Sequence, residues 1–473
     1  MDSLVLSNID LTVHKGARLA VVLDAPKAKL VRASRDRDAR QPGPRCVPVM
    51  RRALVMFTAL SVVLVSVSAC VAASSPQARS VSGQAVRTWN EIERAQVAGN
   101  PLQLARVLAI MHAAQHDAVN GAVPRYETHA SNLSDPAADA EAADSAAHAV
   151  LVSFFPESQA SLDAQLSDSL VSVPDGPAED AGVALGRAVA RLHLGLRAND
   201  GFNGSDPFNP TPGPGVWEPT PPASAPMLEP QFHNVSPFTL NDRTQFLPPS
   251  PPALTSATYT QDFTEVKRFG QDTSSARTAD QTHLGHFWAE SSPVDWSRVA
   301  NIVSSDRGYD LHQTARLQAL LNMAMADGFI VGWFQKRHFA FWRPVTAIRQ
   351  ADTDGNPSTT ADAQWMALRE TPPLPDYPST HSLLGGVAAE ILRRFTGSDH
   401  FRFCMNSTTA KPAGTQRCWE TFTQAEHENA ESRVMVGFHF RFACDTGVDV
   451  GRKISQFAIG HSLRPLPDDE EGS

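Results

Sequence analysis

Apolar residues recur every three to four positions through most of the chain, which is the period of an amphipathic helix. The pattern covers residues 86–123, 137–155 and 158–197, and it returns in a helix-rich region over 278–462. Tyr is scarce, with 4 residues, while Pro reaches 35, so strands are disfavoured and proline-bearing loops are expected between helices. The pattern therefore predicts an all-α protein.

A long segment without helical periodicity separates the two helical regions. Over residues 201–256 the composition shifts to Pro, Asn and Ser, as in the run Pro-Pro-Ser-Pro-Pro at 248–252. This composition is typical of a connector and not of a core element. We predict two helical bundles, residues 84–200 and 278–462, joined by a Pro-rich connector.

The charge balance argues against one large class of partner. The chain has 41 Lys and Arg against 50 Asp and Glu, a formal net charge of −9. Proteins whose affinity depends on neutralising nucleic-acid phosphates carry the opposite sign. We therefore expect no nucleic-acid partner.

An export signal begins unusually far along the chain. Met50-Arg51-Arg52 is a basic start, and an apolar stretch of about 15 residues follows, shorter than the roughly 20 that a membrane span needs. The stretch ends in Ser68-Ala69-Cys70, which fits either a simple cleavage site or a lipoprotein box with a lipid anchor on Cys70. Residues 50–70 are therefore predicted to be a signal peptide or lipoprotein signal, and 1–49 an upstream extension. We expect an exported protein, either secreted or anchored in a membrane.

Five cysteines remain to be placed, and export permits disulfides. Cys46 and Cys70 lie upstream, which leaves Cys404, Cys418 and Cys444. These three have no C-x-x-C spacing, so a zinc site is disfavoured. We expect one disulfide, between Cys404 and Cys418, and one free thiol.

Candidate chemistry gathers in three segments of the second half. In the first, Lys336 and Arg343 are seven residues apart and Pro344 follows. Seven residues are about two helical turns, so both cations would lie on one face, roughly 10 Å apart along the axis. Pro344 predicts a bend or helix end. Taken alone, the segment also fits two solvated cations on an amphipathic helix.

The second segment, residues 375–382, predicts the start of a helix. Ser379 is a suitable N-cap, which places His381 in the first turn. The free N–H groups and the positive dipole end of such a helix can bind an oxyanion. A capped helix with an incidental histidine is the alternative for this segment alone.

The third segment, residues 432–442, contains Arg433 and His439. On a straight helix, six residues at about 100° each would point the two side chains roughly 120° apart. A break is needed to bring them together, and Gly437 is a candidate for it. A core helix with two satisfied polar residues is the alternative.

Together, the order Lys-x6-Arg-Pro, Pro-Ser-x-His and Ser-Arg-x5-His resembles a three-part signature. It is the signature of the superfamily that contains vanadium-dependent haloperoxidases and type 2 phosphatidic acid phosphatases. Residues 109–120 also look like a helix of the bacterial haloperoxidase-like branch. The resemblance implies two helical bundles of haloperoxidase type, with vanadate as cofactor and phosphate able to occupy the same site.

The resemblance assigns a role to each matching residue. His439 matches the histidine that bonds vanadium or phosphorus, and His381 matches the acid–base histidine opposite it. The donors around the equatorial oxygens are matched by Lys336, Arg343, Ser379, the backbone N–H of Thr380, and Arg433. Three cations, a hydroxyl and a helix N-terminus also suit a tetrahedral oxyanion on physical grounds.

Phosphate and vanadate have nearly the same shape and charge, so one pocket fits two reactions. We expect a vanadate-dependent haloperoxidase-like enzyme that oxidises a halide with hydrogen peroxide, with Lys336 polarising the bound peroxide. The alternative enzyme is a soluble acid phosphatase in which His439 attacks a phosphate ester and His381 protonates the leaving alcohol. The third interpretation is a non-catalytic oxyanion-binding surface lipoprotein. The lipid phosphatases usually carry several membrane helices, which favours the haloperoxidase branch here.

Two positions depart from the family's pattern. Thr380 stands where glycine is common, which keeps the backbone donor and puts the space beside the oxyanion in question. Ala443 stands where the family carries an aspartate, four residues after the last histidine. A carboxylate normally orients such an imidazole. The nearest following carboxylate is Asp445, which would take this role if the backbone bends.

Some other residues have a functional and a structural interpretation. Trp333 and Leu374 fall where haloperoxidases shape the halide site, although such apolar residues also fit a plain core. Two histidine pairs invite a metal interpretation: His112 with His116, and His283 with His286. Neither pair has a third ligand placed by spacing, so we expect structural roles for both.

Overall fold

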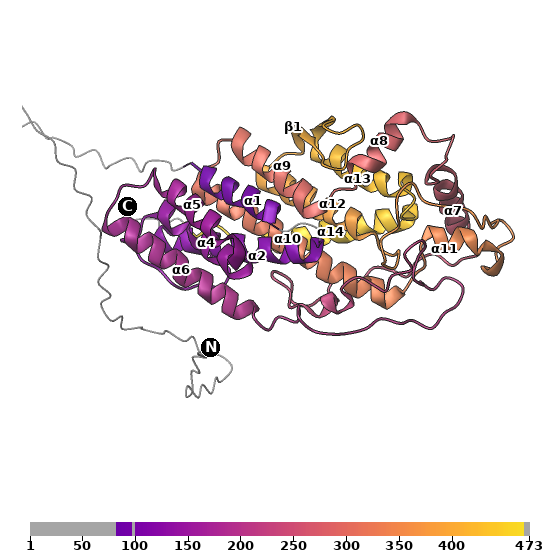
Figure 1. Cartoon of the computed structure of the whole chain (residues 1–473), viewed down its shortest axis with the longest axis horizontal. Helices are drawn as coiled ribbons and strands as arrows, with labels where there is room; N and C mark the ends of the chain where they lie inside the picture. The colour runs from indigo at the N-terminus through magenta and orange to yellow at the C-terminus, as the bar shows by residue number, and fades with distance from the viewer. Residues whose placement is uncertain (1–81, 97–99, 468–473) are drawn as a thin grey trace, which may run out of the picture. The chain divides into compact units, whose positions relative to one another are not determined.

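The structure of the chain, a computed structural model, describes residues 82–96 and 100–467 (Figure 1). These residues belong to one compact unit. The predicted extension 1–49, the signal segment 50–70 and Cys70 lie outside the described residues. Export and lipid anchoring therefore stay predictions.

Helices make up the first half of the described chain, as the periodicity predicts. They are α1 (Gln84–Gln96), α2 (Pro101–Ala122), α3 (Ala140–Ala143), α4 (Ala146–Phe154), the 3-10 turn η1 (Pro156–Ser158), α5 (Gln159–Leu170) and α6 (Pro177–Arg197). The pattern over 86–123 indicated one helical region, but the structure divides it into α1 and α2. Asn100 caps the new helix by accepting from the N–H groups of Leu102 and Gln103, and Pro101 occupies the first turn.

The second half is also helical. Its helices are α7 (Ala257–Phe269), α8 (Ala279–Phe287), α9 (Ser292–Asp306), α10 (Leu311–Phe339), α11 (Pro344–Arg349), α12 (Thr380–Thr396), α13 (Phe422–Met435) and α14 (Arg441–His461). Two 3-10 turns complete the helical elements: η2 (Pro230–Asn234) and η3 (Ala351–Thr353). The all-α fold class is confirmed.

A small antiparallel sheet was not predicted from the sequence. Its strands are β1 (His400–Asn406) and β2 (Gln416–Thr421), too short for their alternation to stand out against the helical pattern. Cys404 lies opposite Cys418 and forms the expected disulfide. Cys444 is the free, buried cysteine of the described region.

Helix α10 is the centre of the core. It packs against α2 on one side and α12 on another, and α12 packs in turn against α14. By length and composition α10 is apolar enough to cross a membrane, but 94% of its most apolar window is buried inside the protein. Its apolar surface is thus covered by neighbouring helices, as in a core helix.

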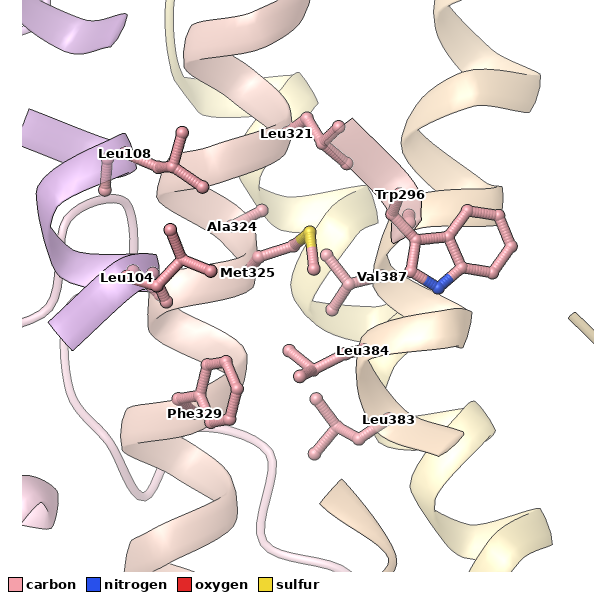
Figure 2. Packing of buried hydrophobic residues seen from close by; sticks show 14 of the residues in the cluster. Leu104, Leu108, Trp296, Leu321, Ala324, Met325, Phe329, Leu383, Leu384 and Val387 are labelled. Carbon is pink, nitrogen blue, oxygen red and sulfur yellow. The ribbon is translucent and has the colours of Figure 1, made fainter. Parts of the chain in front are cut away.

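Side chains from both halves of the sequence meet around α10. Figure 2 shows leucines of α2 facing one side of α10, with apolar residues of α12 and a tryptophan of α9 nearby. The labelled side chains are Leu104, Leu108, Trp296, Leu321, Ala324, Met325, Phe329, Leu383, Leu384 and Val387. One hydrophobic cluster therefore runs through α2, α10 and α12. The boundaries proposed for two separate bundles stay a prediction.

The chain between α6 and α7 is attached to α10 by a buried carboxylate. Asp327 of α10 accepts hydrogen bonds from the backbone N–H groups of Phe238 (2.6 Å), Thr239 (2.7 Å) and Leu240 (3.2 Å). The Thr239 hydroxyl donates a further bond to it, at 2.6 Å. These bonds hold residues 238–240 against the helix that carries Lys336.

Candidate active site

The three predicted segments meet where helices begin or end. Lys336 lies in the last turn of α10, and Arg433 lies in the last turn of α13. Arg343 and Ser379 are the N-cap residues of α11 and α12, and His439 lies in the turn before α14. Side chains at helix ends can point toward a shared space without disturbing the packed helix interiors.

The first segment corrects one prediction. Lys336 and Arg343 were expected on one helical face, but α10 ends at Phe339 and Ala340 adopts a left-handed conformation with φ 48°. Pro344 then begins α11, so a helix boundary does lie here. The two cations belong to different helices, and the turn at Ala340 brings them to one site.

Lys336 binds the loop that precedes Ser379. Its ammonium donates to the carbonyl oxygens of Pro375 (2.6 Å), Asp376 (3.0 Å) and Pro378 (2.8 Å). An ammonium has three N–H donors, so these carbonyls use all of them. Burial, followed by the charge of Arg343, holds the pKa of Lys336 well below its ordinary value.

Ser379 caps α12 as predicted. Its hydroxyl oxygen accepts from the N–H of Ser382 at 3.4 Å, and its own N–H donates to the Ala443 carbonyl at 2.9 Å. Thr380, the first residue of α12, is buried, and its side chain lies against Gly332 of α10: a Cβ placed at Gly332 would be 2.8 Å from the Thr380 hydroxyl. The absence of a side chain at Gly332 thus makes room for threonine where the family commonly has glycine.

His381 has one engaged and one free ring nitrogen. Nδ1 lies 3.0 Å from the Ser292 hydroxyl at the start of α9, whereas the buried Nε2 has no hydrogen-bond partner among the described residues. Burial, and then the charge of Arg433, holds the pKa of His381 well below its ordinary value. A neutral imidazole with a free Nε2 can take up or release a proton there. Sequence reasoning did not identify Ser292 as its partner.

The break expected at Gly437 is confirmed. Gly437 has φ +84°, and a Cβ on it would lie 2.5 Å from the Gly270 carbonyl oxygen, so only glycine fits. Beyond the break, the N–H groups of Phe438 and His439 both donate to the Arg433 carbonyl, at 3.0 and 3.2 Å. The turn therefore places His439 next to the end of the helix that carries Arg433.

Both ring nitrogens of His439 face charged groups. Nδ1 lies 2.9 Å from Oδ1 of Asp376, and Nε2 lies 2.9 Å from Nη1 of Arg343. Arg343 is itself held by the carbonyls of Leu374 (2.6 Å) and Phe438 (2.8 Å). Burial, followed by the Arg343 charge, keeps the pKa of His439 well below its ordinary value.

Asp376 is a site residue that sequence reasoning missed. Asp445, expected to replace the aspartate missing at Ala443, has an exposed side chain, so that expectation is wrong. The carboxylate beside His439 comes instead from the second segment, three residues before Ser379. Its signal in the sequence was an acidic residue inside a motif already recognised for binding oxyanions.

Arg433 is held by the backbone of the segment before α9. Its Nη1 donates to the Trp288 carbonyl at 2.8 Å, and its guanidinium lies over the Phe438 ring, 5.1 Å from the centroid. Its Nε is buried without a partner among the described residues. Burial lowers the pKa of Arg433 to about 9 and that of Arg343 to about 10.

Buried positive charge exceeds buried negative charge in this site. Lys336, Arg343 and Arg433 are buried, with the carboxyl group of Asp376 beside Arg343 and that of the buried Asp295 close enough to Arg433 to affect its pKa. Burial raises the pKa of Asp376 to about 7, against the opposite effect of the cations. Uncompensated buried charge is costly. An oxyanion would supply negative charge, together with acceptors for the free N–H of Arg433, so these residues fit vanadate or phosphate.

The free cysteine lies beside the same cations. The thiol of Cys444 is fully buried, and it is close enough to interact electrostatically with Lys336, Arg343 and Arg433. Burial raises the pKa of Cys444 to about 12, so it remains a neutral thiol. The residues around Cys444 in the sequence did not indicate that its thiol lies beside these cations.

Residues assigned to the halide site lie in the core. Trp333 is buried against Phe232 and Phe329, and its indole N–H donates to the Leu228 carbonyl at 3.0 Å. Leu374 is also buried, and its carbonyl binds Arg343. A role for either side chain toward a halide stays a prediction.

Three of the four histidines in the two pairs have a polar partner for their ring. Nε2 of His112 lies 3.3 Å from Oδ1 of Asn90, and Nε2 of His116 lies 3.0 Å from the Glu127 carbonyl. In the other pair, His283 contacts the guanidinium of Arg417. Over residues 82–96 and 100–467, no group of three or more His, Cys, Asp or Glu side chains is placed to hold a metal ion.

Comparisons with known proteins point to the same family as the three motifs. Residues 316–467 match the family model of the VCPO second helical-bundle domain. Over 91 residues the chain is 36% identical to vanadium chloroperoxidase of Curvularia inaequalis. That alignment covers 17% of this chain and 14% of the relative.

Solved structures extend the likeness to most of the chain. A bacterial vanadium-dependent iodoperoxidase aligns with a TM-score of 0.70 and 26% identity, over 82% of this chain and 99% of that chain. An apo-type bacterial vanadium-dependent chloroperoxidase shares the fold, with a TM-score of 0.64 and 18% identity over 78% and 96% of the two chains. With its three motifs gathered in one buried site, the chain belongs to the superfamily of vanadium-dependent haloperoxidases and type 2 phosphatidic acid phosphatases, in the bacterial haloperoxidase-like branch.

Proposed function

We propose that the chain is a vanadate-dependent haloperoxidase that oxidises a halide with hydrogen peroxide. The observation that carries this proposal is the excess of buried positive charge around His439, with the free Nε2 of His381 nearby. The names of the solved relatives, an iodoperoxidase and two chloroperoxidases, support the choice of reaction.

The residues would hold the oxyanion from several sides. His439 would bond the central atom through Nε2, while Arg343 and Arg433 would neutralise the surrounding oxygens. The Ser379 hydroxyl and the N–H of Thr380 would donate hydrogen bonds from the start of α12. Bound vanadate supplies a Lewis acid that makes peroxide susceptible to attack by a halide.

Proton transfer is assigned to His381. The overall reaction, halide plus hydrogen peroxide plus a proton giving hypohalous acid and water, consumes one proton. The ring of His381 is held through Nδ1 by Ser292, so its free Nε2 is the atom that would hold and deliver this proton. The low pKa of the buried ring favours release of the proton once it is bound.

Lys336 would contribute to oxyanion binding mainly through its positive charge and through its hydrogen bonds to the loop before Ser379. Its three N–H donors already bind the carbonyls of Pro375, Asp376 and Pro378. Direct polarisation of peroxide by Lys336 would require one of these bonds to be exchanged. Its positive charge acts on the oxyanion in either arrangement, because a buried site screens charge weakly.

A phosphatase is the second candidate, favoured by one contact. The carboxylate of Asp376 faces Nδ1 of His439, an arrangement that also makes Nε2 a better nucleophile toward phosphorus. His381 would then protonate the leaving alcohol. A site that binds the oxyanion without turnover is the third possibility.

One set of assays separates these candidates. We expect the purified protein, loaded with vanadate, to halogenate a dye precursor with peroxide and iodide or bromide, and to lose this activity without vanadate. Hydrolysis of a chromogenic phosphate ester with no halogenation would favour the phosphatase. Tight binding of vanadate or phosphate with neither reaction would refute both enzymes.

A further inference from the structure

We propose that Asp376 is the positioning residue for His439, replacing from a different segment the aspartate that the family carries at position 443. This inference rests on the proposed function, because it concerns how His439 is oriented toward an oxyanion. The carboxylate that orients His439 would then come from the loop before α12, whereas the family's sequence pattern places it on α14.

The contact between Asp376 and His439 is short, and the backbone of Asp376 is held in place. Oδ1 of Asp376 lies 2.9 Å from Nδ1 of His439, and the side chain of Asp376 is fully buried. The backbone of Asp376 is held on both sides: its N–H donates to the Phe341 carbonyl at 2.8 Å, and its carbonyl accepts from Lys336 at 3.0 Å. These bonds fix the backbone from which the carboxylate reaches the imidazole, while the two carboxylate oxygens have no hydrogen-bond partner among the described residues.

Distances identify His439, and not a cation, as the main partner. Nη1 of Arg343 is 4.0 Å from Oδ1 of Asp376, against 2.9 Å for the imidazole nitrogen. Lys336 directs its donors at backbone carbonyls, including that of Asp376 itself. A carboxylate placed only to balance charge would lie nearest a guanidinium or ammonium group.

The position of the carboxylate selects which nitrogen of His439 carries the lone pair, which in this structure faces Nη1 of Arg343 at 2.9 Å. An imidazole whose Nδ1 carries the proton toward a carboxylate presents the lone pair of Nε2 to a ligand. Nε2 is the atom that would bond the oxyanion. Asp376 would thus fix both the tautomer and the angle of the ring.

Matched variants test this role with vanadate binding as the readout. Asp376→Asn keeps the size of the side chain, and we expect it to weaken the affinity for vanadate, measured by calorimetric titration, by about 10- to 100-fold. Inorganic phosphate, titrated in parallel, should lose affinity in the same direction. Asp445→Asn, which removes an exposed carboxylate four residues along α14 from Arg441, should leave both affinities unchanged.

Relocation of the carboxylate gives a test that a purely structural role would not pass. In the double variant Asp376→Asn with Ala443→Asp, the carboxylate returns to the family position, and we expect at least part of the lost affinity to be restored. Thermal unfolding of each variant checks that it is folded. An Asp376→Asn protein that is folded and binds vanadate like the wild type would overturn the proposal.

Nitrogen NMR of His439 separates this inference from the proposed function. In the wild type we expect the proton on Nδ1, and in Asp376→Ala a shift toward the other tautomer. This result is independent of vanadate. If the wild-type chain bound neither vanadate nor phosphate, the proposed function would fail, while the tautomer measurement would still support or overturn the role of Asp376.

Discussion

The contact between Gly332 and Thr380 leads to a prediction that links core packing to the site. A Cβ added at Gly332 would lie 2.8 Å from the hydroxyl oxygen and 3.0 Å from the methyl carbon of Thr380. Ordinary contacts begin near 3.5 Å, so Gly332→Ala must push the two helices or the threonine apart by roughly 0.7 Å. The N–H of Thr380 is a proposed donor to the oxyanion, so this displacement reaches the site.

Two opposing effects set the magnitude for Gly332→Ala. Alanine gains about 1 kcal/mol over glycine inside a helix, while overpacking costs about 1–3 kcal/mol. We therefore expect a loss of up to about 2 kcal/mol in the free energy of unfolding. Activity should fall more clearly, since misplacement near 1 Å can cost about 100-fold.

A double-mutant cycle with Thr380→Gly isolates the contact. Glycine at 380 removes the atoms that the new Cβ would meet, so Gly332→Ala should be nearly harmless in that background. We expect a coupling energy of about 1–2 kcal/mol from urea unfolding, with a matching recovery of halogenation or vanadate affinity. Gly328→Ala, one turn earlier, meets the flexible ends of Leu383 and Leu384 and serves as control, with an effect that should not depend on residue 380. Equal losses from Gly332→Ala in both backgrounds would refute the reasoning.

Three other sites have separate measurable consequences. His439→Ala should abolish vanadate binding in a titration, and an unchanged affinity would contradict the assignment of the site. Burial lowers the pKa of His112 to about 3, so below its ordinary value near 6.5 the unfolded chain binds a proton that the folded chain does not. The free energy of unfolding should therefore fall as the pH drops from about 6.5 toward 3, by up to roughly 1.4 kcal/mol per pH unit, and His112→Gln should make this slope shallower by that amount. Reduction of the Cys404–Cys418 disulfide, which spans 14 residues, should lower the free energy of unfolding by about 3 kcal/mol in chemical denaturation; an unchanged midpoint would argue against its stabilising role.

The sequence was sufficient to predict the helix boundaries near which the candidate site lies. Lys336, Arg343 and Arg433 are cations near helix ends, and Gly437 marked the break that places His439. The boundary at Pro344, the cap at Ser379 and the break at Gly437 were predicted correctly because caps, prolines and glycines act locally, within one or two helical turns. The shared helical face of Lys336 and Arg343 was not. The helical period likewise predicted the all-α class. The β1–β2 hairpin was not predicted, because its strands are too short for their alternation to stand out.

Contacts between distant segments were beyond this reasoning. The pairing of Asp376 with His439 depends on how α12 and α14 approach each other, which no local pattern encodes. The resemblance assigned Lys336 to the oxyanion, which stays a prediction, but it did not reveal that the donors of Lys336 bind carbonyls of residues 375–378. In both cases the residue type was recognisable, but its partner was set by tertiary packing.

Contacts between the second and third segments explain why the absence of an aspartate at position 443 need not weaken the site. Position 443 carries alanine and no carboxylate, but its carbonyl accepts the N–H of Ser379 at 2.9 Å, which ties the start of α12 to α14. Through that tie, and through Lys336, the loop before Ser379 is held where Asp376 reaches His439. The third segment thus provides a backbone carbonyl, at Ala443, that holds the second segment. The second segment provides the carboxylate of Asp376 that contacts His439 in the third. What the chemistry requires is a negative group beside Nδ1 of the histidine, and a folded chain can supply it from either side of the contact.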